Sequence, residues 1–188
     1  MPLTLVTGGI RSGKSRFAEE YLLKKGKNPW IYLPTAYPSD PEMVTRIKRH
    51  QEERDPRFVT LPPLDPSLSL PDLMPRLKSF PREASFLLDG MGLLLSGLLM
   101  GHPEEPIRNL VAQATSFLSF LFEREGLTVV VTEEASLGGI PMTPLGRRFT
   151  DFIGEMNQMM AGRADAVYLV VVGCILPLKE SSNQRPYG

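Results

Sequence analysis

Apolar residues in this chain gather in short, uninterrupted runs that alternate with stretches in which they recur every three or four positions. The uninterrupted runs predict buried strands at residues 3–7, 30–33, 85–89, 127–132 and 166–172. The periodic stretches predict helices at residues 15–24, 42–54, 107–125 and 145–162. Because strands that are apolar throughout are typical of parallel sheets, the alternation predicts an α/β fold with a mostly parallel sheet and helices on both faces.

The remaining segments are expected to be less regular. Many of the 18 prolines fall between residues 34 and 106, and the stretch 55–81 is expected to be loop with one short helix around 71–80. Asp40 and Pro41 predict the start of the helix over 42–54, since a capping carboxylate and a first-turn proline favour helix initiation. The very apolar stretch 92–100 predicts either a buried helix or a contact between identical subunits. The polar tail, from about 180 to 188, is expected to fray.

A complete phosphate-binding motif joins the first predicted strand to the first predicted helix. Its residues are Gly8-Gly9-Ile10-Arg11-Ser12-Gly13-Lys14-Ser15, which fit the pattern Gly-x-x-x-x-Gly-Lys-Ser/Thr. Glycines let consecutive N–H groups point into one cavity, and the helix N-terminus adds a positive dipole end. Lys14 supplies a cation for the β and γ phosphates, and the Ser15 hydroxyl can hold Mg²⁺. The alternative is a glycine-rich turn that binds nothing.

Asp89 is the candidate for a second metal-binding oxygen. It ends the apolar run Phe86-Leu87-Leu88, and a carboxylate at a strand end beside the phosphate-binding loop can order Mg²⁺ directly or through water. The alternative is that Asp89 caps the helix expected after residue 90.

The chain has two histidines, and only one of them lies in a suggestive place. His50 follows Met43 and Ile47 on one face of a helix that is rich in arginine and lysine, a setting that attracts phosphates. By spacing alone, His50 is more often a partly buried structural residue. His102 lies in a Gly-His-Pro loop and is expected to be ordinary surface.

Composition narrows the function classes. The 188 residues carry 21 basic and 21 acidic side chains, so the formal charge is zero and a general nucleic-acid-coating role is disfavoured. One cysteine, Cys174, allows no internal disulfide and fits a reducing cytoplasm. No apolar run is long enough for a membrane span, and the first residues lack the features of a signal peptide. The length suits a single domain over residues 1–188.

Further segments form a pattern with the phosphate-binding loop. They are Arg16-Phe17-Ala18-Glu19, Tyr32-Leu33-Pro34-Thr35-Ala36, Asp40-Pro41-Glu42-Met43-Val44-Thr45-Arg46-Ile47 with His50 and Arg54, Glu134, Gly138-Gly139-Ile140-Pro141, Arg148-Phe149-Thr150-Asp151, Gly154, Asn157-Gln158 and Ala164-Asp165. With them, the chain from Leu3 to about Lys179 strongly resembles the bifunctional adenosylcobinamide kinase / adenosylcobinamide-phosphate guanylyltransferase family of cobalamin biosynthesis. The resemblance implies a RecA-like P-loop fold and a homo-oligomer, a trimer in the family.

The resemblance also implies two reactions and their residues. A nucleoside triphosphate, GTP or ATP, phosphorylates adenosylcobinamide, and GTP then donates GMP to the new phosphate through a covalent histidine intermediate. His50 matches that histidine, and Lys14 of the loop is the second expected catalytic residue. The matching nucleotide-binding positions are Gly8 to Ser15, Thr35, Ala36, Tyr37, Gln51, Glu52, Glu53, Arg54 and Asp89, with Mg²⁺ held by Ser15 and Asp89.

Some positions depart from the family pattern. Thr60-Leu61-Pro62 stands where the family commonly has Thr-x-Glu, so one nucleotide contact is not expected here. Glu133-Glu134 stands where the family usually shows Asn-Glu, and Tyr37 and Met142-Thr143-Pro144 are also unusual.

Two other functions stay open at this point. One is a P-loop small-molecule kinase in which His50 is structural, and the other is a nucleotide-binding regulatory module whose partner surface is the stretch 93–100. A RecA-like DNA-dependent ATPase is disfavoured by the zero charge and by the lack of a second nucleic-acid-binding region.

Overall fold

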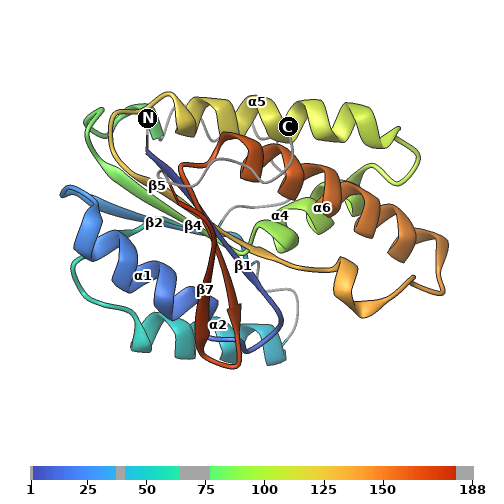
Figure 1. Ribbon diagram of the computed structural model, residues 1–188, viewed down its shortest axis with the longest axis horizontal. Coiled ribbons are helices and arrows are strands. Elements are labelled where there is room, and N and C mark those ends of the chain that lie inside the picture. The colour runs from blue at the N-terminus through green and yellow to red at the C-terminus, as the bar shows by residue number, and fades with distance from the viewer. Residues whose placement is uncertain (1, 37–40, 64–76, 181–188) are drawn as a thin grey trace.

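A seven-stranded sheet forms the centre of the protein (Figure 1). The structure is a computed structural model that describes residues 2–36, 41–63 and 77–180. The strands lie in the order β3-β2-β4-β5-β1-β6-β7. Their bounds are β1 Leu3–Gly8, β2 Trp30–Pro34, β3 Phe58–Thr60, β4 Ser85–Asp89, β5 Thr128–Glu133, β6 Ala166–Val171 and β7 Cys174–Lys179.

All neighbouring strands are parallel except β6 and β7, which form an antiparallel hairpin. The phosphate-binding loop follows β1, and β5 alone separates β1 from β4, the strand that ends in Asp89. The expected RecA-like P-loop fold with a mostly parallel sheet is confirmed. The expected residues Tyr37 and Asp40, most of the expected helix over 71–80 and the tail after residue 180 lie outside the described residues.

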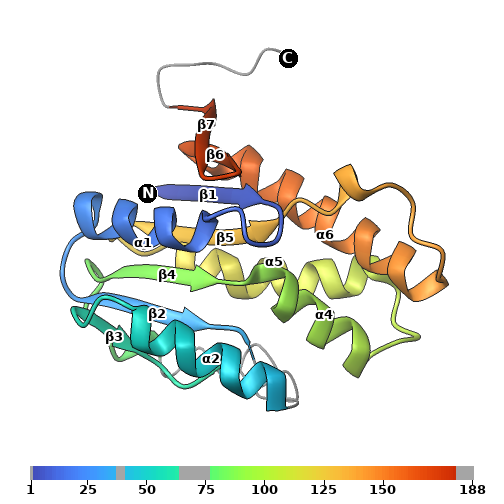
Figure 2. The ribbon, with the colours of Figure 1, turned by 90° about the horizontal axis from the view of Figure 1, so that it is seen from below.

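Helices cover both faces of the sheet (Figures 1 and 2). One face carries α1, Lys14–Lys25, and α2, Pro41–Glu53; the other carries α4, Met91–Gly101, α5, Ile107–Phe122, and α6, Pro144–Arg163. A short 3₁₀ turn, η1, spans Ser136–Gly138. No helix in the described ranges has the length and apolar character that a bilayer crossing requires.

Each face of the sheet has its own apolar core. Between the sheet and α4, α5 and α6, the fully buried side chains include Phe86, Phe117 and Phe152. On the α1 face the core includes Val6, Leu22 and Leu87, together with Tyr32. The apolar stretch 92–100 is a helix whose buried side chains belong to the first core, while Leu93 and Met100 on it are exposed.

Two strands were not expected from the sequence, and both lie at edges of the sheet. The stretch that contains β3 was wrongly expected to be loop, and β7 was not expected at all. In β3 only Phe58 of three residues is buried, and β7 is exposed along nearly its whole length. An edge strand needs little apolar surface, so its residues carry no uninterrupted apolar run.

The turn between β6 and β7 is strained and lies against the phosphate-binding loop. Val172 has a φ of 47° and Gly173 a φ of 81°, and the Gly173 N–H donates to the Ser12 carbonyl oxygen at 2.9 Å. Hairpin turns with two positive φ angles favour Asn-Gly, and a β-branched residue there is an outlier. The Val172 side chain is 86% exposed, so it gains little by packing.

We expect Val172→Asn to raise the free energy of unfolding by about 1 kcal/mol, because Asn tolerates a positive φ that costs an L-residue with a branched Cβ about 1–2 kcal/mol. Urea denaturation measures the change. Val171→Asn, one residue earlier in extended strand backbone, is the matched control and should give no gain. A Val172→Asn protein no more stable than the wild type would contradict the strain argument.

Candidate functional site

The phosphate-binding loop curls tightly between β1 and α1. Arg11 has a φ of 56° and Gly13 a φ of 95°, and the Ser12 N–H donates to the Gly9 carbonyl oxygen at 3.3 Å. A Cβ atom on Gly8 would collide with the carbonyl oxygen of Val170, so only glycine fits there. The Ser12 hydroxyl is buried without a hydrogen-bond partner in the described part of the chain. An unpaired buried hydroxyl in such a loop suits an anionic ligand, because burial without a partner is costly.

Asp89 lies directly beside the start of α1. Its Oδ1 accepts a hydrogen bond from the Ser15 hydroxyl at 3.0 Å, and its Oδ2 accepts one from the Tyr32 hydroxyl. The capping alternative is wrong, because the N-cap of α4 is Gly90 and no side chain caps that helix. A serine hydroxyl and a carboxylate are the hard oxygen ligands that Mg²⁺ prefers. The two residues therefore fit a magnesium site.

A second carboxylate, Glu133, faces the loop from the end of β5. Its Oε1 lies 3.9 Å from the Lys14 Nζ, and its Oε2 accepts a hydrogen bond from the Gly92 N–H at 3.0 Å. Burial raises the pKa of Glu133, whereas the Lys14 charge lowers it and Asp89 raises it further. Sequence reasoning noted Glu133 only as a departure from the family pattern. The sequence signal that could have found it is that Glu133 directly follows the apolar run 127–132, much as Asp89 follows Phe86-Leu87-Leu88.

The Thr35 hydroxyl donates to the backbone of the turn that follows β4. It lies 2.6 Å from the Gly90 carbonyl oxygen and 2.9 Å from that of Asp89, and the side chain is buried. This contact fixes the backbone that carries the Asp89 carboxylate. Ala36 is half-buried beside it.

His50 lies on α2. It stands in the last turn of α2, which begins at the end of the sheet where the strand arrows point and runs back along the sheet (Figure 2). Nine residues after Pro41, it lies about 13 Å along the helix axis from the start of α2. Met43, Ile47 and His50 are half-buried, which confirms the predicted stripe. Gln51, Glu52 and Glu53 are exposed.

Arg54, just beyond α2, lies on the ring of Tyr32. Its guanidinium carbon is 3.3 Å from the ring centroid, and its Nη1 donates to the Thr60 hydroxyl at 3.2 Å. Its Nε is buried without a hydrogen-bond partner within the described ranges. Thr60, which begins the stretch that departs from the family pattern, thus serves Arg54 here.

Glu19 on α1 interacts electrostatically with Arg54, the residue that follows α2. Burial raises the pKa of its carboxyl from 4.5 to about 7, against the opposing effect of the Arg54 charge and with added repulsion from Asp89 and Asp55. A carboxyl with such a pKa holds a proton in part at neutral pH.

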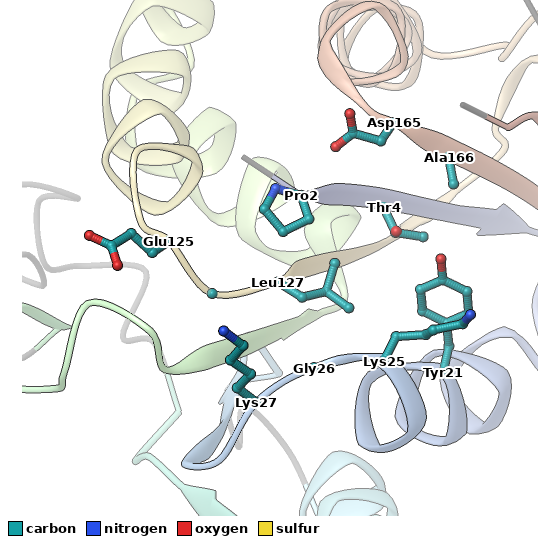
Figure 3. Close-up of a pocket in the computed structure, with 11 residues that line it drawn as sticks. Pro2, Thr4, Tyr21, Lys25, Gly26, Lys27, Glu125, Leu127, Asp165 and Ala166 are labelled. Atoms are coloured by element: carbon teal, nitrogen blue, oxygen red, sulfur yellow. The ribbon is translucent and has the colours of Figure 1, made fainter. Parts of the chain in front are cut away.

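A cavity of about 480 Å³ lies at the opposite end of the sheet (Figure 3). Its lining includes Pro2 and Thr4 at the start of β1, Leu127 before β5, and Asp165 before β6, with Lys25 at the end of α1. No nucleotide-binding residue predicted from the sequence lines it. The site chemistry therefore gathers at the carboxyl ends of the strands, where ligands of open α/β sheets bind.

Comparison with known proteins gives one family over nearly the whole chain. The family model described as "Cobinamide kinase / cobinamide phosphate guanyltransferase" matches residues 4–178. The Pseudomonas aeruginosa protein named bifunctional adenosylcobalamin biosynthesis protein CobP is 35% identical over 176 residues, which cover 93% of this chain and 96% of that protein. The Salmonella typhimurium protein named bifunctional adenosylcobalamin biosynthesis protein CobU is 32% identical over 191 residues, with 94% and 99% covered.

A solved structure gives a likeness of fold alone. The structure titled "Structural study of Project ID PH0250 from Pyrococcus horikoshii OT3" matches with a TM-score of 0.55 and 13% sequence identity. The match covers 97% of this chain and 88% of that chain.

We expect the stability of the wild-type protein to carry a pH dependence from Glu19. Ionising the buried Glu19 carboxyl lowers the free energy of unfolding. This loss is absent below the ordinary pKa of 4.5, grows between pH 4.5 and about 7 and is complete above that, because the folded chain holds the proton more tightly than the unfolded chain. Since the side chain keeps some contact with water, we expect Glu19→Gln to gain about 1 kcal/mol over wild type at pH 8 and nothing at pH 4. Urea denaturation at both pH values measures this.

Glu20→Gln is the matched control, because Glu20 is the next residue, is exposed and pairs with Arg16 on the same helix. It should not change the pH profile. A Glu19→Gln protein with the same stability difference from wild type at both pH values would contradict the assignment.

Proposed function

The chain belongs to the cobinamide kinase / cobinamide phosphate guanyltransferase family, and from that premise we propose how its residues divide the two reactions. The enzyme phosphorylates adenosylcobinamide with a nucleoside triphosphate. It then transfers GMP from GTP to adenosylcobinamide phosphate, which yields adenosylcobinamide-GDP and pyrophosphate in cobalamin biosynthesis. The observation that supports the site most directly is the 3.0 Å contact between Ser15 of the complete phosphate-binding loop and Asp89.

In the kinase reaction the loop holds the triphosphate, and the substrate hydroxyl attacks the γ-phosphorus. The new O–P bond forms as the bond from the γ-phosphorus to the β–γ bridging oxygen breaks, and a nucleoside diphosphate leaves. Lys14 and the loop N–H groups stabilise the charge on the transferring and leaving phosphates. No protein nucleophile is needed for this reaction.

In the guanylyl transfer, we assign the nucleophile to His50. An imidazole nitrogen attacks the α-phosphorus of GTP, an N–P bond forms and pyrophosphate leaves. A phosphate oxygen of adenosylcobinamide phosphate then attacks the same phosphorus, and the N–P bond breaks. Gln51, Glu52, Glu53 and Arg54 are proposed to contact the nucleotide, as are Thr35, Ala36 and Tyr37.

Ser15 and Asp89 are proposed to hold Mg²⁺, because the Ser15 hydroxyl oxygen lies 3.0 Å from the Asp89 Oδ1. When bound, the ion supplies positive charge to the β and γ phosphates. Lys14, Ser12 and the loop backbone bind and orient the phosphates.

Several properties of the whole enzyme are part of the same proposal. Residues 1–188 act as one nucleotide-binding domain, and the enzyme works as a homo-oligomer, a trimer by its family resemblance. Its single cysteine fits a cytoplasmic location. Its partners are the corrinoid substrates and GTP or ATP, with no nucleic acid and no stable membrane insertion.

One observation favours a second candidate, a kinase without the guanylyl transfer. His50 is half-buried in the Met43 and Ile47 stripe, in the last turn of α2, a helix that runs back along the sheet from the end where the strand arrows point. That placement suits a structural histidine as well as a nucleophile that approaches the nucleotide only when GTP is bound. Covalent labelling separates the two.

We expect GTP radiolabelled at the α-phosphate, with Mg²⁺, to leave acid-labile and alkali-stable label on the denatured wild-type protein. His50→Ala should lose at least about 1,000-fold of this labelling, because it removes the nucleophile. It should keep phosphorylation of adenosylcobinamide within about threefold, because that reaction uses no histidine. Scintillation counting and a kinase assay measure the two.

His102→Ala, which changes the second histidine, is the matched control and should label like wild type. Absence of label from a wild-type protein that still binds GTP would leave the kinase alone and return His50 to a structural role.

We also expect α2 to occupy a different place when GTP is bound, since His50 must reach the α-phosphate. Crystal structures with and without GTP and Mg²⁺ test this. The same position of residues 41–54 in both would contradict the movement.

A further inference from the structure

Tyr32 touches both the proposed metal site and the end of the helix that carries His50. We propose that Tyr32 is a positioning residue that couples these two parts of the enzyme, an inference that rests on the proposed function. The side chain is 3% exposed, its hydroxyl donates to Asp89, and its ring carries the Arg54 guanidinium. The ring of Phe58 packs edge-on against it at 5.8 Å.

The first half of the coupling is the orientation of the Asp89 carboxylate. Its two oxygens have separate donors, with Ser15 on Oδ1 and Tyr32 on Oδ2. A phenol hydroxyl is an O–H donor, so Tyr32 supplies the proton of this hydrogen bond. Without that donor, the carboxylate would be held on one side only. Partners of metal ligands act in this way, and their loss typically weakens metal binding 10- to 100-fold.

The second half is the place of α2. Arg54 follows Glu53, the last residue of α2, and stands four residues after His50, about one helical turn. Its contacts with the Tyr32 ring and the Thr60 hydroxyl attach this end of the helix to β2 and β3. The acidic groups that act on Tyr32 are Asp89 on β4 and Glu19 on α1, and Glu19 also interacts with the Arg54 charge.

One side chain thus joins the two halves. A cation held by Ser15 and Asp89 would compete for the carboxylate that accepts the Tyr32 hydrogen bond, and the Tyr32 ring is the surface on which the Arg54 guanidinium lies. Among the residues that the structure describes, the Arg54 Nε has no hydrogen-bond partner. The contact with Tyr32 and Thr60 therefore does not satisfy the whole guanidinium, which leaves Arg54 able to exchange it for a nucleotide contact. Binding of a cation at Asp89 would therefore change the contact that holds the end of α2, the helix that carries His50.

The effect of Tyr32 on cation binding is tested in the His50→Ala background, where no covalent product forms. The dissociation constant of GTP is measured by calorimetry with Mg²⁺ and with EDTA, and their ratio is the gain due to Mg²⁺. We expect Tyr32→Phe to cut this gain about 10-fold and to leave the constant in EDTA within about twofold. An unchanged gain would overturn the proposal.

The link between Tyr32 and the end of α2 is tested by a double-mutant cycle. The measured quantity is the rate of GMP–His50 formation at saturating Mg²⁺ and GTP. Tyr32→Phe and Arg54→Ala should each slow labelling about 10-fold, and the double variant should be no slower than the slower single variant, because both act through the Tyr32 side chain, whose ring holds Arg54 in place only while its hydroxyl is anchored. Effects that multiply in the double variant would overturn the proposal.

Tyr21→Phe is the matched control, since Tyr21 on α1 packs against Tyr168 and lines the cavity that lies at the opposite end of the sheet. It should leave both readouts unchanged within about twofold. If the wild-type protein fails to label, the guanylyl transfer itself is refuted, whereas the calorimetric test in the His50→Ala background still decides the role of Tyr32. A midpoint of thermal unfolding close to wild type for each variant excludes loss of folding as the cause.

Discussion

The hydrogen bond from Ser15 to Asp89 is the contact on which the site depends. It ties the start of α1 to the end of β4 across the intervening strand β5. Because β5 ends between them, Glu133 lies against Lys14, while Asp89 contacts Ser15 in the next position of the chain. The contact places the hard oxygens for a cation beside a loop already shaped for phosphates.

The fold supports this contact by burying both faces of the sheet. The carboxyl ends of β1, β4 and β5 can lie side by side because their apolar residues pack between α1 on one face and α4, α5 and α6 on the other. Elements at the border of the sheet are held differently. The end of α2 is attached through Arg54 on Tyr32, and the β6–β7 turn through Gly173 on Ser12. Attachment by a few polar contacts suits parts that must respond to ligands.

Whether an element could be predicted from the sequence depends on how much of it is buried. The interior strands and most of the helices could be predicted, because residues buried on both sides must be apolar and helices on a sheet must repeat every three to four residues. The edge strands β3 and β7 could not, because a strand with one neighbour needs no such pattern. Gly8 to Ser15 and Asp89 could be proposed as site residues, because the loop follows one predicted strand and Asp89 ends another.

By itself, the sequence determined the alternation of strands and helices, the phosphate-binding loop and the family. Only the tertiary structure decided which side chains meet. The strand order sets Glu133 against Lys14 and Tyr32 between Asp89 and Arg54, residues that lie far apart along the chain. It also shows that His50 lies in the last turn of α2, a helix that runs back along the sheet from the end where the strand arrows point. Local patterns report burial and backbone geometry, whereas contacts between distant residues arise from the packing of the whole sheet.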